Sequence, residues 1–583
     1  MPKLKSKSKR QKSQKPNNSD TSGLSLKEQL ALQRQAQKQK QKLIQFTTIT
    51  FSIGSLLGLL VGLIAEPELG VAAAVGVTSL SLAYKYPRKA LWAFLIYMPF
   101  GGTVTYAIGN NALLQLAKDG LYIPALIGIF QECRQKKLPF IIPKALRPSL
   151  LILLAVCLLT ILVVNGSQQL LPFCSELPRN GKGLKCISDN DSPILMGILG
   201  LKVFMGYIPL IFCAYYLLRS QKELLFVSRL HTFLAIVCCC LCLVQYTMLL
   251  TGICEGTSDA SGADLFKASI GARCLVGGSL LYSPSQGVVR LPGTFVAPWQ
   301  WGWFLISSAF LTFATAFGDP KPLWRIVGLI GMAFVFICAV ISGQRIALAL
   351  VPAVTIILLV LTGQITNLKR FVPIGLGLAV LLGALATTYP DIIQERIDSF
   401  VGRWEASPAT EFITEQFAFT WKKLDGSLLG LGLGRATNSA RVFGDVSLIE
   451  TWFPKVMHEV GPLGLAAFLG LATSITVLTF KAYRSVQDHN LRSMGASYWV
   501  FILFISYQTY YYPLDVDPVA VYYWLFAGVI LKIPEIDWQE QEKKLAAEEN
   551  EPQSKKKRGK KTSRRRKFAK KAKRRTVAKN KTY

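Results

Sequence analysis

Charged side chains are scarce in this sequence of 583 residues, where they make up 17% of the chain against 51% hydrophobic residues. Soluble domains carry about 25% charged residues, so a globular enzyme of this length would be short of polar surface. The same hydrophobic content excludes intrinsic disorder for most of the chain. Acidic residues are scarcer than basic ones, 34 against 66, and histidine occurs only three times. This composition predicts a polytopic, all-α membrane protein.

The formal net charge of +32 is concentrated at the two ends of the chain. Residues 1–42 contain 12 Lys and Arg against two acids, and residues 551–583 contain 17 against one, which leaves +6 for residues 43–550. The tails 1–42 and 536–583 have no apolar face to bury and are predicted to be disordered. We expect them to bind anionic cytoplasmic lipids, at about 1 kcal/mol per basic residue. Contact with RNA by counterion release is the alternative. No aromatic stacking platform accompanies the charge, however, so nucleic acid is not the expected partner.

Long apolar runs dominate the rest of the sequence. A bilayer core about 30 Å thick is crossed by roughly 20 apolar residues of helix. The first run follows 42 polar residues and has no small-residue cleavage site, so a cleaved signal peptide is not expected. About fourteen segments are predicted to span the membrane, near 43–65, 69–84, 90–108, 112–131, 148–165, 193–218, 229–251, 298–317, 325–342, 346–363, 371–388, 460–480, 496–512 and 518–532.

The distribution of Lys and Arg among the connections predicts the orientation. Cytoplasmic loops carry an excess of Lys and Arg, and with the N-terminus in the cytoplasm the even-numbered connections should be basic. An even number of spans also returns the C-terminus to the cytoplasm, and it leaves a loop at 389–459, predicted to contain short helices, on the external face. The basic connections all fall on the cytoplasmic side, at 85–89, 134–147, 219–229, 321–325, 369–370 and 481–492.

Four of the 12 cysteines lie in predicted external loops, two in each of two long loops. Disulfides persist in oxidising compartments, so we predict the pairs Cys174–Cys186 and Cys254–Cys274. The cysteines at 238–242 lie within a predicted span, where small soft side chains are ordinary packing residues. No His or acid accompanies them, so no metal is expected there.

Arginines in the predicted external loops are the first candidates for a binding site. A single such Arg is more often an interfacial residue that extends to the membrane surface. A group of them suggests an anion, because guanidinium groups bind phosphate bidentately and stay charged. A lipid-linked diphosphate is the expected ligand of the group, which comprises Arg290, Arg345, Arg396, Arg403, Arg435 and Arg441.

Candidate general bases lie near the end of the large external loop. His458 is the only predicted external histidine, and Glu450 and Glu459 flank it. A neutral imidazole or a carboxylate can each accept a proton. On a continuous helix Glu450 and Glu459 would face opposite sides, so they are not expected to share one site. The run 430–434, Gly-Leu-Gly-Leu-Gly, is predicted to be a glycine-rich turn rather than a phosphate loop. No metal-ligand spacing occurs outside, so neither a metal nor another cofactor is expected.

These residues resemble the O-antigen ligase/O-antigen polymerase superfamily of bacterial envelope polysaccharide assembly. The resemblance covers about residues 290–480, and its four motifs occur in the family's order. The motifs are Arg290-Leu-Pro-Gly-Thr-Phe295 with Pro298 and Gly302 after it, Ser342-Gly-Gln-Arg345, Arg396 to Trp404 leading into Gly430–Gly434, and Glu459-Val-Gly-Pro-Leu-Gly464-Leu.

The resemblance implies a helical membrane fold of the GT-C type in the bacterial inner membrane. It implies transfer of glycan from an undecaprenyl-diphosphate carrier on the external face, without metal or nucleotide sugar. External arginines bind the diphosphate in this family, which suits Arg290, Arg345 and Arg435. Ligases of the family carry a His-Asn about nine residues before the Glu of the last motif, whereas this chain has Glu450 there. An acid at that position is similar to the polymerase-type members and leaves polymerisation or ligation open.

The sequence thus divides into a basic tail (1–42), N-terminal spans (43–285), a ligase-like core (286–480) with its external loop (389–459), C-terminal spans (481–535) and a second basic tail (536–583). The predicted substrate is a polyprenyl-diphosphate-linked glycan. Glu450, or else His458, would deprotonate the acceptor, with Arg345 and the other arginines on the diphosphate. A transporter or flippase for an anionic solute is the main alternative, and it predicts charged groups at mid-membrane or broken helices. A non-catalytic assembly protein is the third possibility.

Overall fold

The computed structural model describes most of the chain between residues 26 and 550. The described ranges are 26–108, 117–137, 143–170, 174–175, 185–186, 191–254, 273–274, 276–279, 281–283, 288–364 and 408–550, with single residues between 383 and 405. The chain forms two compact units. Residues 1–90 and 119–128 make up the first, and residues 91–118 and 129–583 the second.

The first unit is built on two long helices that pack tightly against each other, α1 (Leu26–Ile64) and α2 (Pro67–Lys85). Small residues make this close approach possible. A Cβ atom on Gly58 would lie 2.5 Å from the carbonyl oxygen of Gly70 and 2.6 Å from the Cβ of Ala74. Gly54, Gly58 and Gly62 repeat every four residues along α1, which is the pattern by which helices pack closely in membranes.

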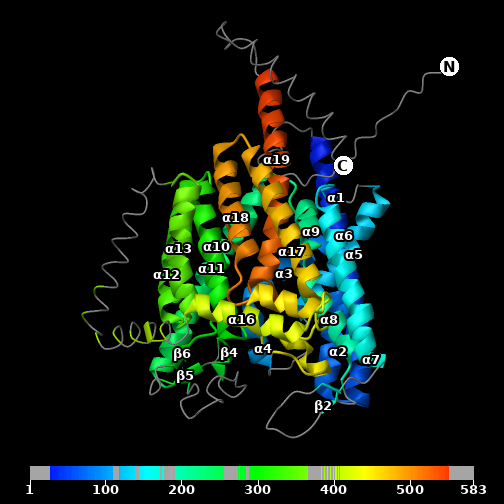
Figure 1. Cartoon of the computed structure of the whole chain (residues 1–583). Coiled ribbons are helices and arrows are strands. Elements are labelled where there is room, and N and C mark those ends of the chain that lie inside the picture. The colour runs from blue at the N-terminus through cyan, green and yellow to red at the C-terminus, as the bar shows by residue number, and fades with distance from the viewer. Residues whose placement is uncertain are drawn as a thin grey trace, which may run out of the picture. The chain divides into compact units, whose positions relative to one another are not determined.

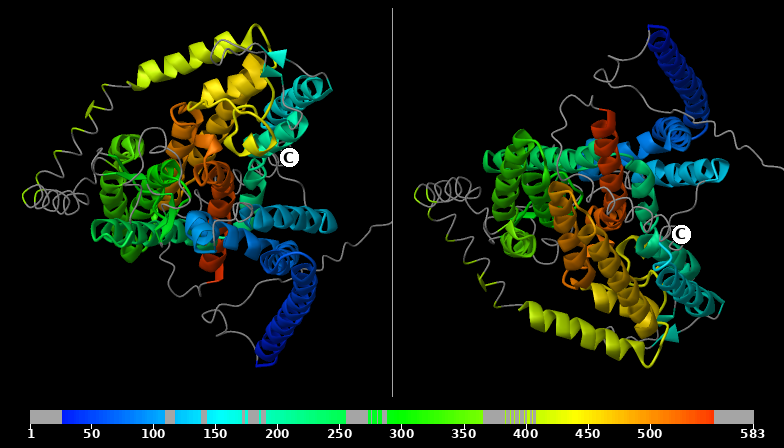
Figure 2. Two further views of the ribbon diagram at one scale, coloured as in Figure 1. Left: turned by 90° about the horizontal axis from the view of Figure 1, so that it is seen from below. Right: turned by 90° about the horizontal axis from the view of Figure 1, so that it is seen from above.

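Helix α11 (Pro298–Gly318) forms the centre of the second unit. Every residue in it from Trp301 onward is buried, as expected for a helix that is apolar on all sides. It packs against four helices that run alongside it, α10 (Gln221–Leu250), α12 (Pro322–Ile341), α13 (Arg345–Leu361) and α18 (His489–Tyr507) (Figures 1 and 2).

A second group of helices packs around α17 (Trp452–Arg484) and α19 (Val519–Asn550). Helix α17 contacts α6 (Arg147–Thr160), α18 and α19, and α19 also contacts α9 (Leu210–Leu217). Two breaks interrupt this group. Helix α17 departs from helical geometry at Gly461, with φ 71° and ψ −178°, and α8 (Pro193–Met205) meets α9 at a bend of 41°.

Short elements complete the chain. The helix α16 (Ala409–Leu424) lies near the lower end of the bundle in Figure 1 and runs beside the start of α17 (Figure 2). Three two-stranded antiparallel sheets pair β1 with β2, β3 with β4 and β5 with β6. The remaining bounds are α3 (Pro87–Tyr97), η1 (Met98–Phe100), α4 (Gly101–Ile108), α5 (Ala117–Gln135), η3 (Ile161–Asn165), α7 (Gly166–Leu170), β1 (Cys174–Ser175), β2 (Lys185–Cys186), β3 (Arg273–Cys274), β4 (Gly277–Ser279), β5 (Leu281–Ser283), β6 (Val288–Arg290), η7 (Asn438–Phe443) and η8 (Pro513–Asp515).

The described helices are those of an all-α membrane protein. Seven of them are long and apolar enough to cross a bilayer, and the bent pair α8–α9 makes an eighth candidate. The other predicted spans fall on shorter or more polar helices such as α13, α18 and α5, except 371–388, which lies outside the described residues. The count of about fourteen spans therefore stays a prediction. The predicted boundary at 285/286 is crossed by the β5–β6 pairing within the second unit.

The two ends of the second unit differ in charge. At the end where α10, α12 and α18 begin, Arg229 forms a two-pronged ion pair with the buried Asp319, at 2.7 and 2.9 Å. Arg325 donates to the Asp319 carbonyl at 2.6 Å, and Arg484 and Arg492 lie at the same end. At the other end, α11, α13 and α17 begin, and α16 lies beside the start of α17.

Candidate functional site

A cavity of about 640 Å³ lies at the end of the second unit away from the Arg229–Asp319 pair. The first residues of α11 and α13 border it, together with the segment between α18 and η8. Basic, acidic and aromatic side chains are mixed in its wall. The lining residues are Arg290, Pro298, Trp299, Trp303, Gly343, Gln344, Arg345, Ile346, Phe412, Asn438, Arg441, Leu448, Glu450, Tyr510, Tyr511 and Tyr512.

Backbone hydrogen bonds place Arg290 beside Arg345 at this cavity. Arg290 ends strand β6, and the next N–H, that of Leu291, donates to the carbonyl of Ser342 at 3.0 Å. The hydroxyl of Ser342 accepts from the N–H of Gln344 at 3.2 Å, just before Arg345 begins α13. The end of β6 and the turn between α12 and α13 are thereby joined, and both guanidinium groups face one cavity.

The segment between Arg290 and α11 is a buried turn that supports this arrangement. Gly293 has φ +55°, and a Cβ atom there would lie 2.5 Å from the ring of Trp301. Its N–H donates to the side-chain carbonyl of Gln245 on α10 at 3.1 Å. The hydroxyl of Thr294 donates to the carbonyl of Pro99. The Gly-Thr-Phe part of the first motif is therefore explained by packing, and Arg290 is the residue of that motif that reaches the cavity.

Glu450 reaches the same cavity from the extended segment before α17. Its N–H donates to the side chain of Gln416 on α16 at 3.3 Å, which fixes its position in the wall. Burial raises the pKa of the Glu450 carboxyl above its ordinary value, while the charges of Arg290 and Arg345 oppose that rise. Burial in turn lowers the pKa of Arg290, again with a contribution from the charge of Arg345. The three groups thus interact electrostatically across one water-accessible space.

Tyr510, Tyr511 and Tyr512 form a wall that the sequence predictions did not include. They connect α18 to η8, and Tyr510 pairs with Thr451 in an isolated β-bridge. The indole N–H of Trp303 donates to the carbonyl of Tyr511 at 3.0 Å. The sequence feature that could have indicated this wall is the run of three consecutive tyrosines at the predicted external end of a span.

The electrostatics of the cavity favour an anion. Three arginines, including Arg441 from η7, face one carboxylate, that of Glu450. The first turns of α11 and α13 also point their N-termini toward it, and helix N-termini carry partial positive charge. Among the described residues the guanidinium of Arg290 has no hydrogen-bond or ion-pair partner. The arrangement can therefore bind phosphate groups and place a carboxylate beside them.

Among the described residues, two of the other predicted site residues, Arg435 and His458, do not line this cavity. Arg435 donates to the side-chain oxygen of Gln168 at 3.1 and 2.9 Å and lies 3.8 Å from Asp191. It therefore does not share a diphosphate with Arg290 and Arg345 in this structure. His458 is buried, with 1% of its surface exposed, and does not line the cavity. Arg396 and Arg403 lie outside the described residues.

The glycine-rich run 430–434 is a packing loop. Gly430, Gly432 and Gly434 all have positive φ, at 78°, 114° and 87°. The N–H of Leu431 donates to the carbonyl of His458 at 2.8 Å, and the N–H of Leu433 donates to the side chain of Asn165 at 2.9 Å. These N–H groups have partners inside the protein, and the run is the turn that the sequence predicted.

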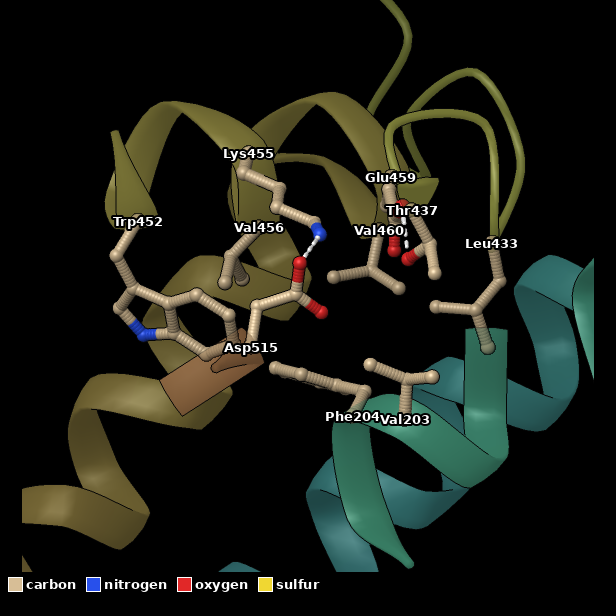
Figure 3. A pocket seen from close by; sticks show the side chains of 10 residues that line it. All are labelled: Val203, Phe204, Leu433, Thr437, Trp452, Lys455, Val456, Glu459, Val460 and Asp515. Atoms are coloured by element: carbon tan, nitrogen blue, oxygen red, sulfur yellow. Dashed lines mark hydrogen bonds and ion pairs between the residues drawn. The ribbon is translucent and has the colours of Figure 1, made fainter. Parts of the chain in front are cut away.

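Glu459 lines a second, much smaller pocket, which is shown in Figure 3. Its carboxylate accepts hydrogen bonds from the N–H of Ala436 at 2.8 Å and the hydroxyl of Thr437 at 2.9 Å. Lys455 forms an ion pair with Asp515 across the same pocket (Figure 3). Glu450 and Glu459 thus lie in different sites. Helix α17 begins only at Trp452, so Glu450 is not on the helix that carries Glu459.

The structure also bears on the four cysteines of the predicted external loops and on possible metal ligands. Cys254 and Cys274 form a disulfide. The backbone places Cys174 directly opposite Cys186 in the β1–β2 pair. Among the described residues there is no group of three His, Cys, Asp or Glu side chains arranged to hold a metal ion.

No model of a known protein family matches this sequence, and no curated protein sequence matches it. The resemblance of residues 290–480 to the O-antigen ligase/polymerase superfamily consists of the four short motifs described above. The first two of these motifs each contribute an arginine to the large cavity, and the last contains Glu459, which lines the separate small pocket.

Proposed function

We propose that this chain is a membrane glycan transferase that polymerises or ligates an undecaprenyl-diphosphate-linked oligosaccharide on the external face of the bacterial inner membrane. The observation that carries the proposal is that Arg290, Arg345 and Glu450 meet in one cavity. The proposal includes a GT-C-like arrangement of about fourteen spans with both termini in the cytoplasm and with basic tails on anionic lipids.

The geometry supports a division of roles within the cavity. Arg290 and Arg345 bind the diphosphate of the donor, because paired guanidinium groups match its planar array of oxygens. They also stabilise the negative charge that develops on the leaving diphosphate in the transition state. Glu450 accepts the proton of the acceptor hydroxyl, and its raised pKa makes it a stronger base than an exposed carboxylate. The acceptor oxygen then attacks the anomeric carbon, the bond to the diphosphate breaks, and the configuration inverts.

The sidedness in the proposal follows from charge. The basic residues Arg229, Arg325 and Arg492 lie at the end of the second unit opposite to the cavity. Since Lys and Arg are enriched in cytoplasmic loops, the cavity is expected on the external face, where a translocated lipid-linked glycan would reach it.

Substitution in a strain that depends on this chain for its polysaccharide tests the proposal. Arg345→Ala should abolish polymer formation and leave expression intact, and Glu450→Gln should do the same in that assay. Arg492→Ala and Glu415→Gln are the matched controls, because both side chains are exposed and neither lines the cavity. Polymer of normal amount and length with Arg345→Ala would refute the assignment.

Transport of an anionic solute or of the lipid-linked glycan is the second candidate, and one observation favours it. The break at Gly461 in α17 and the bend between α8 and α9 lie in helices that line one pocket with a buried Lys455–Asp515 pair. Broken helices with charged groups form substrate sites in transporters. A deletion strain separates the two functions: loss of a transferase leaves the lipid-linked glycan in the outer leaflet, and loss of a flippase leaves it in the inner leaflet.

A further inference from the structure

Aromatic rings make up a large part of the cavity wall that holds Arg290 and Glu450. Besides the charged groups, the wall contains six of them, namely Trp299, Trp303, Phe412, Tyr510, Tyr511 and Tyr512. A diphosphate is recognised by guanidinium and N–H groups and makes no use of such surfaces. A cavity of about 640 Å³ is also large enough for a ligand with several rings. The aromatic part of the wall therefore indicates that the ligand has a second portion, which contacts these rings.

The tyrosines are held in fixed positions at this wall. Tyr511 and Tyr512 have φ of 56° and 32°, a conformation that bulky residues adopt only where the surroundings enforce it. The surroundings include the hydrogen bond from Trp303 to the carbonyl of Tyr511 at 3.0 Å. The N–H of Trp452 also donates to the carbonyl of Thr509 at 2.6 Å. A backbone held in this way sets the direction of the side chains before any ligand arrives.

The rings of Tyr510, Tyr511 and Phe412 contact one another and form a continuous aromatic surface. Tyr510 and Tyr511 have ring centroids 4.4 Å apart at an angle of 75°, and Phe412 contacts Tyr510 edge-on at 5.9 Å. Tyr510 and Tyr511 are half-buried, and Trp299 is 37% exposed. Apolar ring surface that faces an open, solvent-accessible cavity is stabilised when a ligand covers it.

The chemistry of the wall indicates which ligand covers these rings. A polyprenyl chain would be matched by aliphatic side chains, but among the described residues only Ile346 and Leu448 contribute branched aliphatic side chains to the lining. The rings are accompanied instead by hydroxyl and amide groups, those of the tyrosines, Gln344 and Asn438. A sugar ring has this combination of one face of C–H groups and an edge of hydroxyl groups.

We infer that Tyr510, Tyr511 and Trp299 form a subsite for a sugar ring next to the arginines that bind the diphosphate. The subsite rests on the proposed glycan transfer, and it makes Tyr510 a residue that selects the glycan rather than one that takes part in the chemistry. The stacking of Tyr510 on the sugar is expected to contribute to binding of the oligosaccharide and not to binding of the diphosphate.

Binding measurements on the full chain in lipid nanodiscs test the subsite with two probes. One probe is inorganic diphosphate. The other is the oligosaccharide released by mild acid from the lipid-linked pool of a strain that lacks this chain. Tyr510→Leu should weaken oligosaccharide binding about tenfold, and Tyr510→Phe, which keeps the ring, should retain it. Both variants should bind diphosphate as the unmodified chain does, and both should keep its thermal unfolding midpoint.

The outcomes distinguish the subsite from the proposed function. Equal oligosaccharide affinity of Tyr510→Leu and the unmodified chain would overturn the subsite, as would an unmodified chain that binds diphosphate but no oligosaccharide; either result leaves the diphosphate site standing. An unmodified chain that binds neither probe, or a strain that accumulates no lipid-linked pool, would overturn the proposed function and the subsite with it.

Discussion

The carboxylate of Glu459 accepts a hydrogen bond from the hydroxyl of Thr437 at 2.9 Å. The N–H of Ala436 donates to the same carboxylate oxygen, and the helix η7 begins at the following residue, Asn438. Asn438 and Arg441 of η7 line the large cavity. Glu459, which the sequence suggested as a base, therefore acts on the cavity by holding the loop that supplies part of its wall.

Glu459→Ala should lower the stability of the folded chain. The substitution leaves the N–H of Ala436 and the hydroxyl of Thr437 without their buried acceptor, at a cost of about 2–4 kcal/mol. Glu459→Gln retains an acceptor oxygen and should cost less. Thermal unfolding in nanodiscs measures both, with Glu415→Ala on the exposed face of α16 as control. An unfolding midpoint for Glu459→Ala equal to that of the control would show that these hydrogen bonds do not hold the loop.

Arg290 and Arg435 should respond to substitution in opposite ways. Arg290→Ala removes a guanidinium that has no hydrogen-bond partner among the described residues, so it should weaken binding of inorganic diphosphate about tenfold or more with little change in stability. Arg435→Ala breaks its hydrogen bonds to Gln168 and its ion pair with Asp191. It should lower the unfolding midpoint and leave diphosphate affinity unchanged. Weaker diphosphate binding by a folded Arg435→Ala protein would place Arg435 in the donor site after all.

If Glu450 is the general base, the transfer rate should fall at low pH, which gives the pH–rate profile an acid limb. Burial raises the pKa of this carboxyl above 4.5, and Arg290 and Arg345 lower it. A general base works only when ionised, so the rate should fall as the pH drops through this raised pKa. Loss of a nearby positive charge raises the pKa further, so Arg290→Gln should move the acid limb to higher pH. The residual rate of Glu450→Gln should lack the limb, and a limb that persists in this variant would exclude Glu450 as the base.

The helices could be predicted from the sequence because a helix that crosses a lipid bilayer needs a long run of apolar residues. Seven described helices are long and apolar enough to span a bilayer, or eight with the bent pair α8–α9, and the count of about fourteen spans stays a prediction. The breaks were not predictable from hydropathy, since Gly461 and the residues between α8 and α9 are as apolar as their neighbours. Their geometry depends on contacts distant in sequence, such as that of Gly461 with the carbonyl of Leu428.

The candidate site could be predicted only in part. Arginines and acids in the predicted external loops are few enough that Arg290, Arg345 and Glu450 were among the candidates drawn from the sequence, together with Arg435, His458 and others. Nothing local distinguishes Arg435 from them, because its partner Gln168 is more than 260 residues away in the chain. The tyrosines at 510–512 are likewise distant from Arg290 in the chain, and the hydrogen bond from Trp303 that positions them is a long-range contact.

Thiol labelling should count the disulfides. Eight cysteines of the described part have free thiols, and Cys254 is bonded to Cys274. If Cys174 and Cys186 form the predicted second disulfide, the denatured, unreduced chain should take up eight maleimide groups, and the reduced chain should take up all 12. Two further adducts before reduction would show that Cys174 and Cys186 are free. Labelling of all 12 without reduction would contradict both disulfides.

The position of the cavity relative to the membrane decides whether it can meet a translocated lipid-linked glycan. A reporter joined after Thr420, in the helix α16 whose residue Phe412 lines the cavity, should be active on the external side. A reporter joined within the basic connection at 369–370 should be active in the cytosol, because Lys and Arg are retained there. Both fusions carry the same preceding spans apart from 371–388, so the pair also tests whether that segment crosses the bilayer. A cytosolic signal from the fusion after Thr420 would leave Arg290 and Arg345 on the wrong face for the donor, and the proposed function would fail.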